Sequence, residues 1–242
     1  MKKLFFLIFI FSLSFAELPF TFFFKDKKEF YSLNTATLLI PSFTIGGAIA
    51  KTDTDQQILD YYQSHIRSES INQFLSFWKL MGQEQVILPY AFIGLYGGLK
   101  SETPSGAFAK ELFSRCARAF IVGTAPLHIT RALVGGSRPT RTSTSSKWSP
   151  FHRRHGVSGH TYTGAILFIN LAQMTDNTFF KTLFYATSTL TGLSRVNDKD
   201  HYPSQAFLGW MMAYAACNSV TKGTSNFKFT AGPDRVSLSM AF

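Results

Sequence analysis

Five apolar segments of at least 15 residues follow one another along this chain, and they constrain its fold more than any other feature. They run over Gln85–Leu99, Ala107–Val134, Gly159–Met174, Phe179–Leu193 and Gln205–Val220. Segments of this length favour helices that pack on one another. The chain has 242 residues, of which 45% are hydrophobic, which is enough for one sizeable core. We therefore predict an all-α fold, a bundle of five to six core helices.

The chain upstream of these segments has two different patterns. From Asp53 onward apolar side chains recur at the three-and-four spacing of a helix face, at Ile58, Tyr61, Tyr62, Ile71, Phe74, Leu75 and Trp78. Between Glu17 and Ile49 the chain is rich in Phe and is interrupted by Pro19, Pro41 and Gly46-Gly47. This earlier stretch predicts irregular wrapping with short helical pieces.

The lengths of the apolar runs bear on whether the chain crosses a membrane. The longest runs, such as VILPYAFIGLYGGL, stop near 14 residues and contain Gly and Pro. A membrane-spanning helix needs about 18 to 20 apolar residues. The mean hydropathy is only +0.06. We expect a globular body that touches a membrane, and a bundle of membrane-spanning helices is the alternative.

The first sixteen residues, MKKLFFLIFIFSLSFA, are typical of a secretory signal peptide. Lys2 and Lys3 precede a short apolar run, and the small residues Ser14 and Ala16 follow it. We predict cleavage after Ala16, so that residues 1–16 are the signal peptide and residues 17–242 form one domain. The mature chain is then exported and periplasmic. An uncleaved membrane anchor is the alternative.

The net charge favours anionic partners. The formal charge is +10, and removal of Lys2 and Lys3 leaves +8. Phosphorylated substrates, acidic lipid surfaces and nucleic acid all fit such an excess, but export makes nucleic acid the least suitable. The two cysteines, Cys116 and Cys217, are too few for a zinc site or a disulfide framework. A single disulfide and two buried thiols are both compatible with the sequence.

The last residues, about 224–242, have a different period. TSNFKFT is followed by the turn sequence AGPD and then by RVSLSMAF, in which apolar residues alternate with small or polar ones. This alternation predicts a short C-terminal β-hairpin over the helical core. Two strands cannot close a barrel, which disfavours an outer-membrane barrel.

Two motifs offer groups that bind anions. In RALVGGSRPTR, Arg131 and Arg138 are seven residues apart, or two helical turns, and Pro139 ends that helix. Two guanidiniums on one helix face form a fork for phosphate oxygens. In GVSGHTYTG, Ser158 is a good N-cap, so the backbone N–H of Gly159 lies at the positive end of a helix. Each motif alone is also compatible with an ordinary basic or capped helix end.

A third motif places a histidine at a helix start. In LSRVNDKDHYPSQAFLGW, Arg195 ends one helix, and Tyr202-Pro203 open the next. His201 therefore lies at the start of that helix, and Gln205 follows one turn later on the same side. A single histidine in such a place is usually structural or solvated, so the combination of motifs matters more than any one of them.

The three motifs in this order, Arg-x6-Arg-Pro, Ser-Gly-His and Ser-Arg-x5-His, resemble the type 2 phosphatidic acid phosphatase (PAP2) family. That family also includes bacterial acid phosphatases and vanadium haloperoxidases. The resemblance covers roughly a third of the chain, from Arg131 to about Gln205. It implies a phosphate site whose oxygens are held by Arg131, Arg138, Ser158, Gly159 and Arg195. It also implies that His201 attacks phosphorus and that His160 protonates the leaving oxygen.

The chemistry of these residues agrees with the resemblance. Phosphoryl transfer requires mainly positioning and charge stabilisation, which three Arg and a helix start supply without a metal or another cofactor. Cations near His201 disfavour its protonated form and leave a ring nitrogen able to attack. No set of metal ligands is evident in the sequence.

This chain departs from the family pattern at two positions. Val157 stands where the family usually has Pro, which removes no functional group. Gln205 stands where the family usually has an Asp that orients the nucleophilic histidine and balances its charge. The Gln205 amide oxygen can accept the ring N–H but carries no charge. Three outcomes follow: slower catalysis, a substitute carboxylate from Asp198 or Asp200, or phosphate binding without turnover.

The basic loop TRTSTSSKWSPFHRRH joins the first two motifs. Its Arg141, Lys147, Arg153 and Arg154 have no acidic neighbour in the loop. The loop is either a solvated basic segment or a rim for a second phosphate or an acidic lipid headgroup, with Trp148 and Phe151 against acyl chains.

The favoured function is an exported, metal-independent phosphatase for a phosphomonoester or a lipid phosphate, with catalytic His201, His160 and Gln205. The alternative is a protein that binds phosphate or a lipid headgroup without turnover, which Gln205 motivates. A vanadium haloperoxidase is a less favoured third interpretation. The expected partners are a phosphorylated small molecule or lipid and an acidic membrane surface, with no nucleic acid; the oligomeric state stays open.

Overall fold

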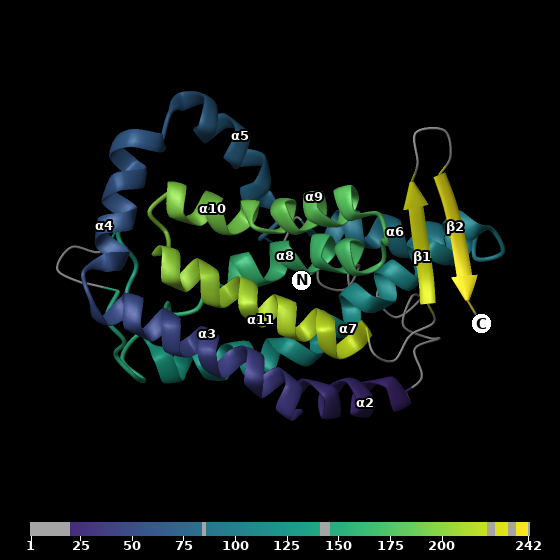
Figure 1. Ribbon diagram of the computed structural model, residues 1–242, viewed down its shortest axis with the longest axis horizontal. Helices are drawn as coiled ribbons and strands as arrows, with labels where there is room; N and C mark the ends of the chain where they lie inside the picture. The colour runs from purple at the N-terminus through teal and green to yellow at the C-terminus, as the bar shows by residue number, and fades with distance from the viewer. Residues whose placement is uncertain (1–19, 84–85, 141–145, 222–225, 232–235, 242) are drawn as a thin grey trace, which may run out of the picture.

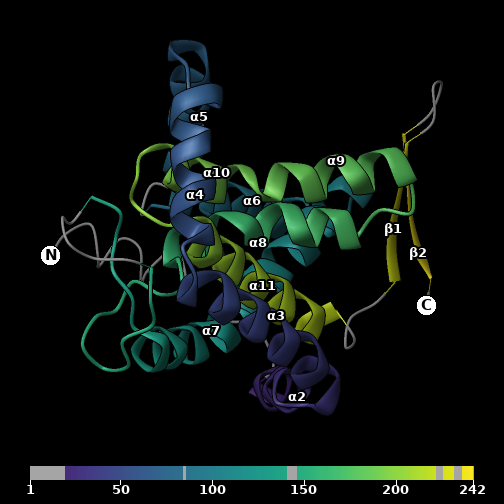
Figure 2. The ribbon, with the colours of Figure 1, turned by 60° about the vertical axis from the view of Figure 1, so that its left-hand side comes forward.

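Three long helices, α7, α8 and α11, form the centre of the computed structural model, which describes residues 20–83, 86–140, 146–221, 226–231 and 236–241 (Figure 1). They run over Pro104–Val134, Gly159–Gln173 and Pro203–Thr221. Small buried residues such as Ala165, Ala213 and Ala216 let these helices approach closely. α8 and α11 lie side by side, with α9 and α10 beyond α8 and α3 along α11 (Figure 2).

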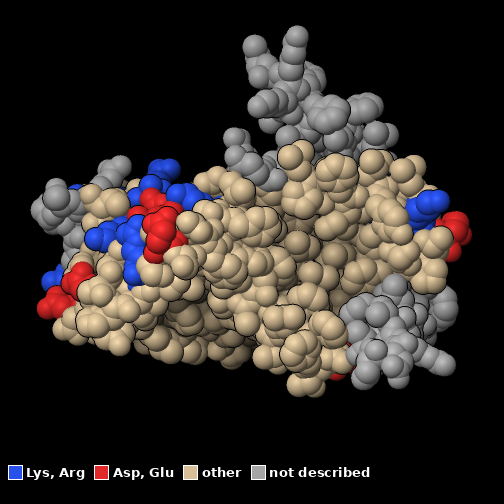
Figure 3. Space-filling view, turned by 90° about the horizontal axis from the view of Figure 1, so that it is seen from above, with Lys and Arg blue, Asp and Glu red and all other residues tan. Residues whose placement is uncertain are grey.

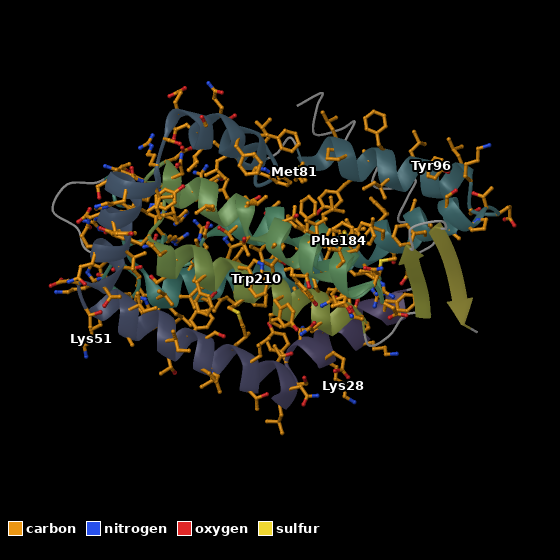
Figure 4. The ribbon with its side chains drawn as sticks, turned by 45° about the horizontal axis from the view of Figure 1, so that its top comes forward. Lys28, Lys51, Met81, Tyr96, Phe184 and Trp210 are labelled. Carbon is orange, nitrogen blue, oxygen red and sulfur yellow. The ribbon has the colours of Figure 1, made fainter. Side chains whose placement is uncertain are left out.

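The remaining helices surround this centre. They are α2 Phe20–Phe30, α3 Leu33–Lys51, α4 Thr54–Tyr61, the π-helical turn η1 Tyr62–Ile66, α5 Glu69–Leu80, α6 Ile87–Leu99, α9 Thr178–Ser188 and α10 Leu190–Asn197. The predicted all-α bundle is confirmed. Figure 4 shows Lys51 pointing outward at the outer edge of this body and Trp210 in its middle.

The prediction of irregular structure between Glu17 and Ile49 is wrong. Most of that stretch forms α2 and α3, and the Ser32 hydroxyl caps the start of α3 by accepting from Thr35 N at 3.5 Å. Pro41 lies inside α3 without ending it. Gly46 marks a packing contact, because a Cβ there would lie 2.9 Å from the Leu208 side chain of α11. The glycines that suggested a break therefore serve close helix packing.

A buried ion pair anchors α2 to α7. Arg118 donates from Nε and Nη2 to the two carboxylate oxygens of Asp26, at 2.6 and 2.5 Å. Both side chains are almost fully buried. Removal of either partner would leave the other charge unpaired in the core, so the pair fixes the N-terminal helix in place.

One helix among the described residues, α3, is long and apolar enough to cross a membrane by length and composition. The apolar runs of the sequence were expected to be too short to span a membrane. This expectation missed α3 because Pro41 and the glycines interrupt the apolar run of that helix. Only 22% of its apolar window is buried inside the protein. Figure 3 shows the opposite side of the body, that of α5 and α9, where charged side chains also gather mainly at the two ends. The surface is therefore compatible with contact to lipid.

The C-terminal residues form the predicted hairpin. β1 Asn226–Ala231 pairs antiparallel with β2 Val236–Ala241, and Phe229 lies opposite Leu238. The turn sequence and the predicted signal peptide lie outside the described residues. Cys116 and Cys217 are both buried and free, and both sulfurs accept from the Asn170 amide, at 3.6 and 3.3 Å. Of the two alternatives for the cysteines, the structure has the buried thiols.

Candidate active site

The three motifs meet at one end of the bundle, where α7 ends and α8 and α11 begin. A cavity of about 230 Å³ lies between them. Its lining comprises Gly82, Phe120, Thr124, Leu127, His128, Arg131, Arg138, Gly159, His160, Tyr162, Thr163 and His201. The cavity therefore combines Arg131, Arg138, His160 and His201 with a wall from α7 and α8, whereas Arg195 is not part of the lining.

The first motif is only partly helical, which corrects the prediction that Arg131 and Arg138 share one helix face. α7 ends at Val134, because Gly135 and Gly136 adopt φ angles of 68° and 92°, a conformation that favours glycine. Arg138 thus reaches the cavity from the loop after α7. Arg131 is in the last turn, and its Nε and Nη2 donate to the carbonyl of Arg154, at 3.1 and 2.9 Å.

The second motif starts α8 as predicted. Ser158 caps the helix and accepts from Thr161 N at 3.3 Å and from the Thr161 hydroxyl at 2.9 Å. Its own backbone N–H donates to the carbonyl of Gln205 at 2.9 Å, which ties the start of α8 to α11. Ser158 is buried and is not part of the cavity lining, whereas Gly159 lines the cavity itself.

The third motif brings Arg195 and His201 together through a tight reversal. The carbonyl of Arg195 accepts from the backbone N–H groups of both Asp200 and His201, at 2.9 and 3.2 Å. Lys199 adopts a φ of 57°, which turns the chain back toward α10. As a result Arg195 is 4% exposed and His201 is 1% exposed.

Gln205 fixes the protonation pattern of the His201 ring. The amide oxygen of Gln205 accepts from Tyr202 N at 3.2 Å, and its Nε2 donates to the Ser137 carbonyl at 2.8 Å. A backbone N–H only donates and a carbonyl only accepts, so these partners set the orientation of the amide. His201 Nδ1, 2.9 Å from the same oxygen, must then be the donor. Nε2 of the neutral ring therefore keeps its lone pair.

His160 and His201 are both held neutral. Burial lowers the pKa of His201 to about 3; the hydrogen bond to Gln205 opposes this shift, and Arg138 and Arg195 add to it. Burial also lowers the pKa of His160 to about 4, and Arg195 and Arg138 lower it further. The imidazole of His201 is therefore a free base at neutral pH.

Three guanidiniums supply positive charge beside the histidines. Arg195 Nη2 lies 2.5 Å from Asp200 Oδ2, and Arg138 Nη1 lies 3.7 Å from Asp200 Oδ1. Among the described residues, Nε and Nη1 of Arg195 and Nε of Arg138 are buried with no hydrogen-bond partner. Buried N–H groups of this kind are costly unless an acceptor is present, so they suit an anion.

Comparison with protein families agrees with this geometry. Residues 112–228 match the family model of the PAP2 superfamily. The match covers just under half of the chain. Every predicted site residue, from Arg131 to Gln205, lies inside the PAP2 segment, residues 112–228. The resemblance seen in the motifs is thereby confirmed.

A solved structure shares the PAP2 fold. It is the crystal structure of the first transmembrane PAP2 type phosphatidylglycerolphosphate phosphatase from Bacillus subtilis. That protein is 16% identical, and the alignment has a TM-score of 0.53 and covers 77% of this chain and 94% of that one. The search of curated proteins found no match. At this identity the likeness supports the fold, and function must be argued from the site.

The PAP2 segment contains site residues that the motifs did not reveal. Phe120, Thr124, Leu127 and His128 line the cavity from α7. Their spacing from Arg131 places them on one helix face, a signal present in the sequence. The His155 ring lies 6.4 Å from the His201 ring between centroids, a contact made across the loop before α8. No local pattern predicts this second contact.

The geometry of the site does not support the alternative in which Asp198 or Asp200 binds His201 in place of the usual Asp. Asp198 Oδ2 lies 2.5 Å from Lys79 Nζ, outside the cavity lining. Asp200 is paired with Arg195 and Arg138. The hydrogen-bond partner of the His201 ring among the described residues is Gln205, through Nδ1.

The depressed pKa of His201 predicts a pH-dependent stability. Its folded pKa of about 3 lies below the ordinary 6.5, so the unfolded chain binds more protons between these values. Stability is therefore lost as pH falls below 6.5, by roughly 1.5 kcal/mol from this residue between pH 6.5 and pH 5. Thermal and denaturant unfolding at both pH values should show a correspondingly smaller loss for His201→Gln. If His201→Gln lost as much stability as wild type between the two pH values, the lowered pKa would not belong to His201. The control is His65→Gln, which replaces an exposed histidine.

Proposed function

We propose that this protein is a phosphatase that hydrolyses a phosphomonoester or lipid phosphate through a phosphohistidine intermediate. The observation that carries the proposal is the group of buried, unpartnered guanidinium N–H groups of Arg195 and Arg138 beside His201. The fold and the superfamily support a phosphatase-type function. Residues 17–242 would form the phosphatase unit after removal of residues 1–16.

In this mechanism the cradle holds the phosphoryl group before any bond changes. Arg131, Arg138 and Arg195 donate to its oxygens, together with the Ser158 hydroxyl and the backbone N–H of Gly159. The start of α8 adds the positive end of the helix dipole. These fixed donors stabilise the charge that develops on the oxygens in the transition state.

His201 then attacks phosphorus with the lone pair of Nε2, and the bond to the leaving oxygen breaks. Its Nδ1–H remains bound to Gln205, which keeps the ring in line. His160 delivers a proton to the leaving oxygen. Its low pKa in the free protein rises once the negatively charged phosphoryl group lies beside it, so substrate binding itself protonates the acid. Water then attacks the phosphohistidine and releases inorganic phosphate.

The second candidate function is phosphate or headgroup binding without turnover, and Gln205 favours it. A neutral amide cannot balance the charge that His201 gains during attack, as a carboxylate does. The Ser137 carbonyl gives a structural reason for the amide, because it requires a donor from position 205. Orientation of His201 is thus preserved while charge balance is lost, which predicts slower catalysis.

Gln205→Asp tests this balance. The shorter carboxylate can still accept from His201 Nδ1 and is drawn back from the Ser137 carbonyl, so we expect phosphate release to be kept or raised. Gln205→Glu keeps the length of the side chain and would face the carbonyl oxygen with a second acceptor, so we expect at least a tenfold loss. Steady-state kinetics on one substrate compare the three proteins. A large loss in Gln205→Asp would instead mean that the neutral side chain is required.

We propose that the enzyme acts at a membrane surface after export to the periplasm. The α7 wall of the cavity carries exposed Phe120, and farther along α7 Ile129 and Leu133 are also exposed. Phe151, in the basic loop, is 74% exposed with a φ of 64°. Apolar side chains next to Arg153 and Arg154 suit a surface of acidic lipids. This arrangement favours a lipid phosphate as substrate, delivered from the membrane to the cavity.

A panel of phosphate esters tests the proposed function. Release of phosphate is measured from p-nitrophenyl phosphate, phosphatidic acid and a polyprenyl diphosphate, each with and without vanadate. We expect turnover of at least one ester and inhibition by vanadate, which resembles the transition state of phosphoryl transfer. Binding of phosphate with no release from any ester would favour the second candidate function.

A further inference from the structure

Asp200 is a carboxylate within the cluster of cations, directly before the proposed nucleophile in the sequence. One of its oxygens lies 2.5 Å from Arg195 Nη2, and the other lies 3.7 Å from Arg138 Nη1. Its side chain is 22% exposed, so the carboxylate is more open to solvent than Arg195, which is 4% exposed. The reversal at Lys199 turns Asp200 back onto the helix that carries Arg195.

The two contacts of Asp200 differ in strength. The contact with Arg195 is a short, charge-assisted bond, whereas 3.7 Å is too long for a hydrogen bond to Arg138. Arg195 keeps Nε and Nη1 free of partners among the described residues, and Arg138 keeps Nε. Asp200 therefore orients both guanidiniums without using all of their donors, and Arg138 is the one it holds loosely.

We propose that Asp200 is an internal anion of the phosphate cradle, which orients Arg195 and Arg138 and opposes the binding of a phosphate dianion between them. The inference rests on the proposed function. With Asp200 ionised, the three arginines and this carboxylate carry a net charge of +2, equal and opposite to a phosphate dianion. Position 205 carries no negative charge beside the imidazole of His201. The carboxylate of Asp200 supplies a negative charge instead, and it lies beside Arg195 and Arg138.

This position has a consequence for turnover. A carboxylate and a dianion that share two guanidiniums repel each other, which weakens the binding of substrate and of product phosphate alike. Release of the product returns Arg138 to Asp200. The residue therefore limits product inhibition at the expense of affinity, and its removal should lower both KM and kcat.

The test compares Asp200→Asn with wild type by calorimetric titration of the full chain with inorganic phosphate and with vanadate. Asn keeps a hydrogen bond to Arg195 and removes the charge. We expect the Kd for phosphate to fall about tenfold, the size of effect that a nearby unit charge produces. KM should fall in the same direction, and kcat should fall because product leaves more slowly. Asp60→Asn, which loses an exposed charge that accepts from Gln56 Nε2, is the control and should leave Kd, KM and kcat unchanged.

Two results would overturn the inference. Weaker phosphate binding in Asp200→Asn would mean that the carboxylate only orients the arginines, and an unchanged Kd would mean that it does not compete. Asp200→Ser removes the same charge and decides the matter if the Asn variant does not fold. Failure of the proposed function looks different, because wild type would then release no phosphate from any ester, whatever the Kd of Asp200→Asn for phosphate.

Discussion

Replacement of His201 with alanine is expected to reduce phosphate release by at least ~10⁴-fold while phosphate binding stays within a few-fold of wild type. The reason is that, in the proposed mechanism, Nε2 of His201 forms the bond to phosphorus, whereas the guanidiniums of Arg138 and Arg195 hold the oxygens. The measurement pairs kcat on the best substrate with the Kd for inorganic phosphate. Loss of a nucleophile lowers kcat and leaves Kd nearly unchanged, whereas loss of a binding residue raises Kd as well.

The matched control for this variant is His65→Ala, which removes an exposed imidazole on η1, outside the cavity lining. It should retain wild-type turnover. If His201→Ala turned over substrate at the wild-type rate, His201 would not be the nucleophile. If His201→Ala lost phosphate binding as completely as turnover, the role of His201 would be structural. Loss of the buried side chain would then have collapsed the site.

Replacement of Arg195 is expected to have the second largest effect, and it should affect binding and turnover together. Arg195→Ala removes the buried N–H groups and leaves Asp200 without its closest partner. We expect kcat/KM to fall by roughly 10³-fold or more. Arg195→Lys keeps the charge but not the planar fork, so a loss of about 10²-fold is expected.

Arg67→Ala is the control for this second prediction. Arg67 is exposed and donates to Asn72 and Gln63, with no part in the cavity lining. Its removal should leave kcat/KM unchanged. Full activity in Arg195→Lys would show that a point charge suffices at this position, and full activity in Arg195→Ala would remove Arg195 from the site.

The sequence indicated which of the candidate residues lie together, because these residues stand at helix ends. Ser158 caps α8 and His201 precedes α11, and both positions follow from local rules for capping and for proline at a first turn. The contact between His201 and Gln205 follows from their spacing of four residues. Wherever a side chain is positioned by its own helix, the sequence was sufficient.

The sequence was insufficient where position depends on distant parts of the chain. Arg138 was expected on the helix of Arg131, but Gly135 and Gly136 end α7 first. Pro41 was expected to interrupt a helix that packing against Leu208 of α11 maintains. Contacts such as that between Asp26 and Arg118 join residues far apart in the sequence, so no local pattern reveals them.

The central claim is that His201 carries the phosphoryl group on Nε2. The most direct measurement quenches a single turnover of labelled substrate and identifies the modified residue and ring nitrogen by mass spectrometry and NMR. The structure predicts a base-stable, acid-labile phosphohistidine at His201, with phosphorus on Nε2 because Nδ1 is bound to Gln205. Phosphate release from wild type with the label on another residue, or with no phosphoenzyme formed at any time, would contradict the claim.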